Sequence, residues 1–240
     1  MKVIIAKDYD DMSEKAFGIM LETVKSNPNA VLGLATGSTP IGLYRNMVRD
    51  HREKGTSYKN IRTVNLDEYA GLEGTHPQSY ACFMRKNLFD QLDIQEKNTN
   101  IENGAAKDAD AECARYNALL EEMPRDIQIL GIGSNGHIAF NEPGTPFGST
   151  THTVRLAEST IRDNSRLFDS IDEVPRAAFT MGLKNIMQSK KIVILANGAN
   201  KANAVYGLVK GEVTERVPAS VLQLHPDCVL ICDEAAASRL

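Results

Sequence analysis

The sequence predicts an α/β fold in which a mostly parallel sheet carries helices on both faces. Short runs of β-branched residues alternate along the chain with segments whose apolar residues recur at helical spacing. This alternation is typical of strands joined by helical crossovers. The 240 residues fit one domain with a full core, and no linker-like tract or internal repeat divides them. We therefore expect a single domain over residues 1–240.

The first strand is predicted at residues 2–6, where the sequence reads K-V-I-I-A. A helix follows, and Asp10 or Asp11 is expected to cap its N-terminus. The helix is expected to end before Pro28. Its apolar residues recur every four positions, as they do on one buried face: Met12, Ala16, Met20 and Val24.

A second strand at residues 30–35 leads into T-G-S-T-P at residues 36–40 and then into a helix. The apolar residues of that helix also follow helical spacing: Ile41, Tyr44, Met47 and Val48. A third strand alternates over residues 61–66 and is expected to end in D-E-Y at residues 67–69. Helical spacing then returns near residues 78–91 and 109–122.

In the second half of the chain, residues 127–130 predict a strand that enters a glycine-rich loop. Two more strands, at residues 191–196 and 228–232, flank a helix that begins near Ala199. The interval 145–170 is polar and has mixed patterning. We expect this interval to be a mobile lid over the sheet rather than an element of the core.

Composition limits the partners of the chain. The formal net charge of −4 gives no support for binding to nucleic acid or to an anionic membrane. No apolar run is long enough to span a bilayer or to serve as a signal peptide. We therefore expect a cytoplasmic protein that acts on a small molecule, with no nucleic acid and no membrane as partner. The cysteines are scattered and are interpreted as reduced core thiols: Cys82, Cys113, Cys228 and Cys232.

Three unusual motifs each follow a predicted strand: T-G-S-T-P, D-E-Y and G-I-G-S-N-G-H. Ligands of open α/β sheets collect outside the carboxyl ends of the strands. We therefore expect the three motifs to converge at one edge of the sheet.

The glycine-rich loop is the most informative of these motifs. It brings Asn135, His137 and Glu142 within eight residues, on backbone too irregular to be a helix. An imidazole beside an amide and a carboxylate can be tuned for proton transfer near neutral pH. The alternative is a surface loop with an incidental histidine. The glycines also match G-x-G-x-x-G, but prolines rather than a helix follow them, so we expect no dinucleotide and no other cofactor.

The T-G-S-T-P motif suits a phosphate group. Thr36, Gly37, Ser38 and Thr39 combine hydroxyls with a flexible glycine directly before a helix. The unpaired N–H groups of a helix N-terminus favour an anion there. The alternative is an ordinary Ser/Thr cap followed by a proline in the first turn of the helix. The motif lacks the lysine of a nucleotide P-loop, so ATP hydrolysis is not expected.

Four charged residues are further candidates. Asp67 and Glu68 lie where the third strand ends, and such a pair is usually solvated. If one of them faced the cleft, burial would raise its pKa and make it a usable base. Arg166 and Lys201 are single cations, each more commonly a surface charge, but Lys201 lies at a loop-to-helix junction suited to a phosphate. The five histidines are isolated, so we expect no metal site.

Five motifs occur in a fixed order: A-T-G-S-T-P from Ala35, N-L-D-E-Y from Asn65, H-P-Q-S-Y from His76, G-H-I-A-F-N-E-P from Gly136 and L-Q-L-H from Leu222. With them the chain resembles the glucosamine-6-phosphate deaminases, from the first strand to about Asp233. The resemblance implies a Rossmann-like, doubly wound sheet and the conversion of glucosamine 6-phosphate and water to fructose 6-phosphate and ammonia. The alternatives are a 6-phosphogluconolactonase-like enzyme, another sugar-phosphate isomerase or hydrolase, and a sugar-phosphate sensing domain. The related lactonases normally follow the histidine with T-A-S-L-F, which differs from the sequence here.

The resemblance also implies roles for individual residues. Asp67 would be the base that moves a proton between C2 and C1 of the open sugar. His137 would be the acid and base of ring opening, oriented by Glu142 and Asn135. The phosphate would be held by Thr36, Gly37, Ser38, Thr39, Arg166 and Lys201.

The chain departs from the family pattern at two places. Many members carry aspartate where this chain has Asn135, and an asparagine can orient His137 but cannot raise its pKa by charge. The hexameric, allosteric members use a basic pair where this chain has His152 and Val154, and a longer C-terminal tail. We therefore expect a monomer or small homo-oligomer with no activation by an amino-sugar phosphate.

Overall fold

A seven-stranded parallel sheet forms the centre of the computed structural model, which describes residues 1–156 and 170–240. Its strand order is β1-β10-β9-β6-β2-β3-β5, and every pairing in it is parallel. The strands are β1 (Lys2–Ala6), β2 (Val31–Leu34), β3 (Arg62–Asn65), β5 (Thr99–Asn100), β6 (Ile127–Gly131), β9 (Ile192–Ala196) and β10 (Cys228–Asp233). The inner strands β2, β9 and β10 are buried along their whole length, as a sheet covered on both faces requires. The predicted fold class is confirmed.

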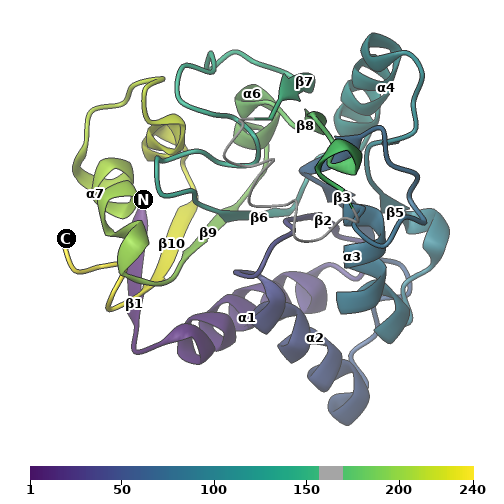
Figure 1. Cartoon of the computed structure of the whole chain (residues 1–240). Coiled ribbons are helices and arrows are strands. Elements are labelled where there is room, and N and C mark those ends of the chain that lie inside the picture. Colours follow the sequence, from purple (N-terminus) through teal and green to yellow (C-terminus); the bar gives the residue numbers. More distant parts are fainter. Residues whose placement is uncertain (157–169) are drawn as a thin grey trace.

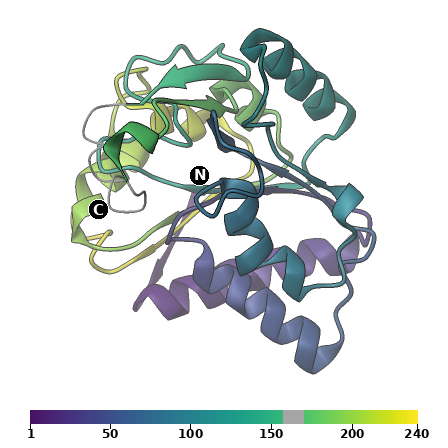
Figure 2. The ribbon, with the colours of Figure 1, turned by 45° about the vertical axis from the view of Figure 1, so that its right-hand side comes forward.

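Helices cover both faces of this sheet. Figure 1 shows α1 and α2 side by side below it, with α4 and α6 above, and Figure 2 shows the same two layers from the side. The helices are α1 (Tyr9–Ser26), α2 (Ile41–Lys54), α3 (Tyr80–Asn87), α4 (Ala109–Glu122), α6 (Leu183–Met187) and α7 (Ala202–Lys210). Short 3-10 segments join them: η1 (Phe89–Gln91), η2 (Glu96–Asn98), η3 (Ile171–Glu173), η4 (Ala199–Lys201) and η5 (Pro218–Leu224). The longer helices lie where the sequence predicts them.

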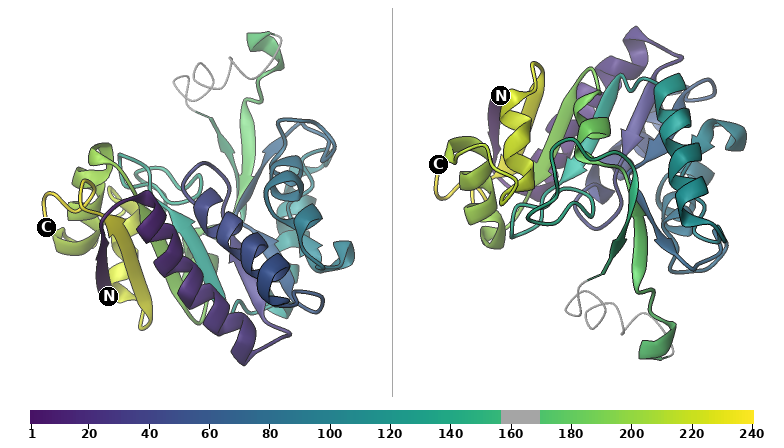
Figure 3. Two further views of the ribbon diagram at one scale, coloured as in Figure 1. Left: turned by 90° about the horizontal axis from the view of Figure 1, so that it is seen from below. Right: turned by 90° about the horizontal axis from the view of Figure 1, so that it is seen from above.

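The structure contains a second sheet, which the sequence does not predict. It has three antiparallel strands in the order β4-β8-β7: β4 (Asp67–Ala70), β7 (His152–Arg155) and β8 (Ala177–Thr180). The D-E-Y motif is therefore a strand of its own rather than the end of β3. Figure 3 shows this sheet projecting from the main body. Its own apolar cluster is Tyr69, Leu72, Leu156, Val174 and Ala178.

The interval predicted to form a lid, residues 145–170, contains strand β7 of the small sheet. Strand β7 pairs with β8, and Val154 packs against the small apolar cluster. Residues 157–169, which include Arg166, lie outside the described residues.

The cysteine prediction is confirmed for three thiols. Cys113, Cys228 and Cys232 are buried and free, whereas Cys82 is free but only half-buried. Within residues 1–156 and 170–240, no helix is long and apolar enough to cross a membrane.

The N-terminus of α1 corrects a sequence prediction. Asp8, with extended backbone, is the cap, and its carboxylate accepts the N–H of Asp11 at 2.9 Å. Asp11 in turn accepts the N–H of Lys7, the residue before the cap, at 3.0 Å. Asp10 and Asp11 therefore lie inside the first turn. Three aspartates within four positions offered the same capping chemistry, and the sequence could not distinguish them.

We expect Asp8→Ala to lower the free energy of unfolding by about 1 kcal/mol, because it leaves the N–H of Asp11 without its acceptor. Asp10→Ala is the matched control, and it should change the free energy by less than about 0.5 kcal/mol. Urea unfolding of both variants measures the difference. An equal or larger loss in Asp10→Ala would contradict the assignment of the cap.

Candidate functional site

A cleft of about 310 Å³ opens at the carboxyl ends of β2, β3 and β6, and we call it the Asp67 cleft. Its walls include Ala35 and residues 36–39 after β2, Leu66 and Asp67 after β3, and residues 131–134 and His137 after β6. The predicted convergence of the three motifs is confirmed. From the adjacent strands β2 and β6 the sheet grows in opposite directions, so the cleft lies at a topological switch point, where α/β sheets bind ligands.

The side chain of Glu68 is held by backbone N–H groups. Its buried carboxylate accepts three N–H groups at 2.8–2.9 Å, from Tyr69 in its own strand and from Tyr80 and Ala81 in the first turn of α3. Burial raises the pKa of Glu68, and the three N–H groups oppose this by stabilising the ionised form. Glu68 therefore ties β4 to the start of α3.

Asp67, the preceding residue, has no comparable set of donors. It is 6% exposed and lines the cleft, and the contact of its carboxylate is a long one, 3.5 Å to the hydroxyl of Thr36. The pKa of Asp67 is raised to about 7, first by burial and then by the charge of Glu68, against a smaller lowering by the hydroxyl of Thr36. A carboxyl group with this pKa can exchange a proton near neutral pH.

Glu102 is a third buried carboxyl group near this pair, and it belongs to none of the motifs from which the site was predicted. It is 1% exposed, and neither of its oxygens has a hydrogen-bond partner among the described residues. Burial, followed by the charge of Asp67, raises the pKa of Glu102 well above its ordinary value.

The glycine-rich loop holds the imidazole of His137 in a fixed position. Nδ1 of His137 lies 3.2 Å from Oε1 of Glu142, and the contact with His137 lowers the pKa of Glu142. Asn135 joins both residues, because its amide donates to Glu142 at 2.7 Å and its oxygen accepts the backbone N–H of His137 at 3.1 Å. A Cβ at Gly133 would lie 2.3 Å from the ring, so only glycine fits beneath it. The loop can present to the cleft an imidazole paired with a carboxylate.

Aromatic side chains form another wall of the cleft. Tyr80 stacks on Phe140 with ring centroids 6.3 Å apart, and its hydroxyl donates to that of Tyr69 at 3.3 Å. Ala139, beside Phe140, has a left-handed φ of 52°, a strained conformation for a residue with a Cβ. Sequence reasoning missed this wall, although Tyr80 and Phe140 belong to the quoted motifs.

The loop after β2 lines the cleft with all four residues predicted there, Thr36, Gly37, Ser38 and Thr39. Gly37 has a φ of 89°, which favours glycine. Pro40 is the N-cap of α2 rather than a first-turn residue, and it makes no side-chain capping bond. The hydroxyl of Tyr9 accepts the N–H of Gly42 at 2.8 Å instead.

Lys201 reaches the same cleft from η4. Burial lowers the pKa of Lys201, and no ion pair joins it to a described residue. The loop before it is fixed by Asp233, which accepts the N–H of Gly198 at 2.9 Å and that of Ala236 at 2.7 Å. The cleft thus combines one ammonium group with the hydroxyl-rich loop, which suits a phosphate ester. In the described part of the chain, no group of His, Cys, Asp and Glu side chains could hold a metal ion.

The chain is similar to sequences of known activity over its full length. A family model described as glucosamine-6-phosphate isomerases/6-phosphogluconolactonase matches residues 9–230. The glucosamine-6-phosphate deaminase of Lactobacillus johnsonii is 55% identical, with 100% of this chain and 98% of the relative covered. That of a Geobacillus species is 52% identical, with 99% and 95% covered.

The chain is also similar to solved structures over its full length. A monomeric glucosamine-6-phosphate deaminase matches with a TM-score of 0.95 and 48% identity, over 100% of both chains. The 6-phosphogluconolactonase from Trypanosoma brucei matches with a TM-score of 0.80 over 100% of this chain and 98% of the other, at 19% identity. This second likeness shows the fold alone.

We expect Asp67→Asn to stabilise the protein at high pH. Because the folded state raises the pKa of Asp67 from 3.8 to about 7, stability falls as pH rises through this interval in the parent protein. Asn does not titrate, so the variant loses this dependence on pH. The difference in the free energy of unfolding between the variant and the parent protein should therefore grow from pH 4 to pH 7 by roughly 2–4 kcal/mol in favour of the variant.

Urea unfolding at pH 4, 6 and 8 measures this gain. Asp10→Asn, at an exposed position, is the matched control and should show little change with pH. A difference between Asp67→Asn and the parent that is the same at all three pH values would contradict a raised pKa.

Proposed function

The chain belongs to the family of glucosamine-6-phosphate isomerases and 6-phosphogluconolactonases, and we propose that it converts glucosamine 6-phosphate and water to fructose 6-phosphate and ammonia. The observation that carries this proposal is the composition of the Asp67 cleft. A buried carboxyl group with a pKa of about 7, a carboxylate-paired imidazole and an ammonium group share one cavity. Relatives of about 50% identity over the full chain carry the same activity in their names.

Ring opening is the first step that we assign. One proton must reach the ring oxygen and another must leave the hydroxyl on C1. His137 can perform both transfers, because an imidazole both donates and accepts protons near neutral pH. Glu142 and Asn135 hold the ring in position through the contacts described above.

Proton transfer by Asp67 follows. Its carboxylate removes the proton from C2 of the open sugar, and a proton passes from the substrate's ammonium group to the oxygen on C1, which gives an enolamine across C1 and C2. Return of the proton to C1 leaves a protonated imine at C2. Water adds to that carbon and ammonia leaves, so fructose 6-phosphate remains. The raised pKa suits Asp67 to both directions of this transfer, because it binds the proton long enough to return it.

The phosphate group is assigned to the other end of the cleft. The loop after β2 offers amides and hydroxyls there, from Thr36, Gly37, Ser38 and Thr39. Lys201 offers a positive charge, and no described aspartate or glutamate forms an ion pair with it. We retain Arg166 as a third partner of the phosphate on the resemblance alone. A lid at residues 145–170, which would carry Arg166, is likewise part of the proposal.

The proposal extends to the state of the protein. We propose that residues 1–240 act as one catalytic domain, as a cytoplasmic monomer or small homo-oligomer, without activation by an amino-sugar phosphate. The solved relative with a TM-score of 0.95 is described as monomeric, which supports a monomer here.

Two coupled assays separate this activity from that of a lactonase. The purified protein should release ammonia and fructose 6-phosphate in equal amounts from glucosamine 6-phosphate. Hydrolysis of 6-phosphogluconolactone without any ammonia release from the amino sugar would overturn the proposal.

We expect Asp67→Asn to lower turnover by about 10²–10⁴-fold while leaving substrate binding nearly intact, because the amide is isosteric but cannot accept the C2 proton. The Asp67→Asn variant should also lose the exchange of the substrate's C2 hydrogen with deuterated water. In the parent enzyme, kcat/KM should rise with pH and level off above about 7, since the base must be ionised.

The binding of a substrate analogue, measured over the same pH range, serves as the control for titration of the substrate's own phosphate. Near-normal turnover in Asp67→Asn, or a flat profile between pH 5.5 and 7.5, would remove Asp67 from this role.

We expect Lys201→Ala to weaken binding of the phosphorylated substrate by about 10- to 150-fold, the equivalent of one charge-assisted hydrogen bond. Lys210→Ala, at the exposed end of the same α7 helix, is the matched control and should bind normally. Inorganic phosphate should compete with the substrate in the parent enzyme and much less in Lys201→Ala. Equal affinities in the two variants would contradict the assignment.

A further inference from the structure

A short segment between α7 and β10 contacts the loop that carries His137 and Glu142, and none of the motifs from which the site was predicted includes it. We call residues 214–219 the Glu215 segment. The described walls of the Asp67 cleft do not include this segment. Any influence that it has on the reaction must therefore pass through residues that do line the cleft.

The Glu215 segment holds the residue that precedes His137. The backbone N–H of Ala219 donates to the carbonyl of Gly136 at 2.9 Å. A Cβ on Gly136 would lie 2.7 Å from Cγ1 of Val217, so the valine packs directly on this glycine. Gly136 also has a left-handed φ of 85°, which favours glycine. The backbone immediately before the imidazole is therefore fixed by a hydrogen bond and a packing contact from the same segment.

Glu215 holds the turn that follows Glu142. The backbone carbonyl of Glu215 accepts the N–H of Gly144 at 2.8 Å, and its carboxylate accepts the N–H of Phe147 at 3.0 Å. Between these two contacts, Thr145 donates its N–H and its hydroxyl to the carbonyl of Glu142, at 3.0 and 2.7 Å. Glu215 thus holds both ends of the turn that closes on Glu142.

The Glu215 segment is itself fixed by short-range contacts. The buried hydroxyl of Ser220 accepts the N–H of Thr214 at 2.9 Å and donates to the carbonyl of the same residue at 3.0 Å. The N–H of Val217 donates to the carbonyl of Thr214 at 2.9 Å. Val217 also packs on α7, because a Cβ on Gly207 would lie 3.4 Å from its Cγ1. The segment can therefore act as a firm support for the loop.

We propose that Glu215 is a positioning residue for ring opening and that it acts through Glu142 rather than by contact with the substrate. This inference rests on the ring-opening role proposed for His137. The side chains of His137 and Glu142 are 35% and 48% exposed, so water competes for their contact of 3.2 Å. By fixing the backbone on both sides of this pair, the Glu215 segment holds the carboxylate against the ring before the substrate binds.

Glu215→Ala should lower kcat and kcat/KM together by about three- to tenfold, the equivalent of one hydrogen bond. Inhibition by inorganic phosphate should stay at the parent value, because the phosphate end of the cleft is unchanged. Glu215→Gln keeps an oxygen that can accept the N–H of Phe147, so it should retain most of the activity. In a Glu142→Gln background, Glu215→Ala should cause no further loss.

A spectroscopic readout does not depend on the reaction. The nitrogen-15 resonance of His137 Nδ1, assigned with His137→Gln, should move in Glu142→Gln, where the ring loses its carboxylate. In Glu215→Ala the same resonance should move in the same direction. Because Glu215 is exposed, we expect this variant to fold.

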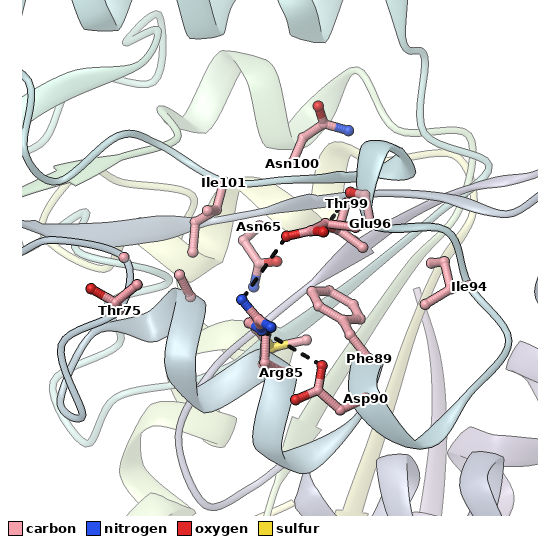
Figure 4. Close-up of a pocket in the computed structure, with 13 residues that line it drawn as sticks. Asn65, Thr75, Arg85, Phe89, Asp90, Ile94, Glu96, Thr99, Asn100 and Ile101 are labelled. Atoms are coloured by element: carbon pink, nitrogen blue, oxygen red, sulfur yellow. Dashed lines mark hydrogen bonds and ion pairs between the residues drawn. The ribbon is translucent and has the colours of Figure 1, made fainter.

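Two exposed glutamates give matched controls. Glu212 lies just before the Glu215 segment. Glu96 lies 3.9 Å from Arg85 at a separate cavity, which shares no lining residue with the Asp67 cleft (Figure 4). Alanine at either position should leave kcat and the His137 resonance at the parent values.

Unchanged kinetics or an unchanged His137 resonance in Glu215→Ala would overturn the positioning role. A loss in the Glu142→Gln background as large as in the parent would also overturn it, because Glu215 would then act by another route. Failure of the parent protein to release ammonia would instead contradict the proposed function, and the resonance would still test the contact between Glu215 and the His137 loop.

Discussion

The three N–H groups that converge on Glu68 are the constraint on which the site depends. Two of them, from Tyr80 and Ala81, tie the first residues of β4 to the first turn of α3. Successive residues of a strand point to opposite sides, so fixing Glu68 turns Asp67 toward the cleft. The charge stabilised on Glu68 then adds to the burial that raises the pKa of Asp67. Of these two adjacent carboxyl groups, Glu68 thus joins β4 to α3, and Asp67 lines the cleft with a raised pKa.

This arrangement links reactivity to a cost in stability. Among the described residues, the buried carboxyl group of Asp67 has only a hydroxyl at 3.5 Å as a contact, which destabilises the ionised folded state and lets the group exchange a proton near neutral pH. The remainder of the fold offsets that cost through the fully buried strands of the parallel sheet. The His137 loop and the Lys201 loop are held by carboxylates in the same manner, Glu142 and Asp233 respectively.

Much of the parallel sheet and of the Asp67 cleft could be predicted from the sequence, because the parallel strands are continuous apolar runs that end in distinctive motifs. The small sheet could not, because β4, β7 and β8 are short, and Asp67 pairs with Thr180, far away in the chain. The role of Glu68 was hidden for the same reason, since two of its donors lie in α3. Asp8 was missed because neighbouring aspartates offer the same capping chemistry. The predicted roles of the site residues stay predictions, and Arg166 lies outside the described residues.

The central claim is that the carboxyl group of Asp67 titrates near neutral pH in the free protein. Carbon-13 NMR of protein labelled at aspartate side-chain carboxyls, with Asp67→Asn used to assign the resonance, measures this directly. The account predicts a midpoint near pH 7 for that resonance. A midpoint near 4, the ordinary value for an aspartate, would contradict it.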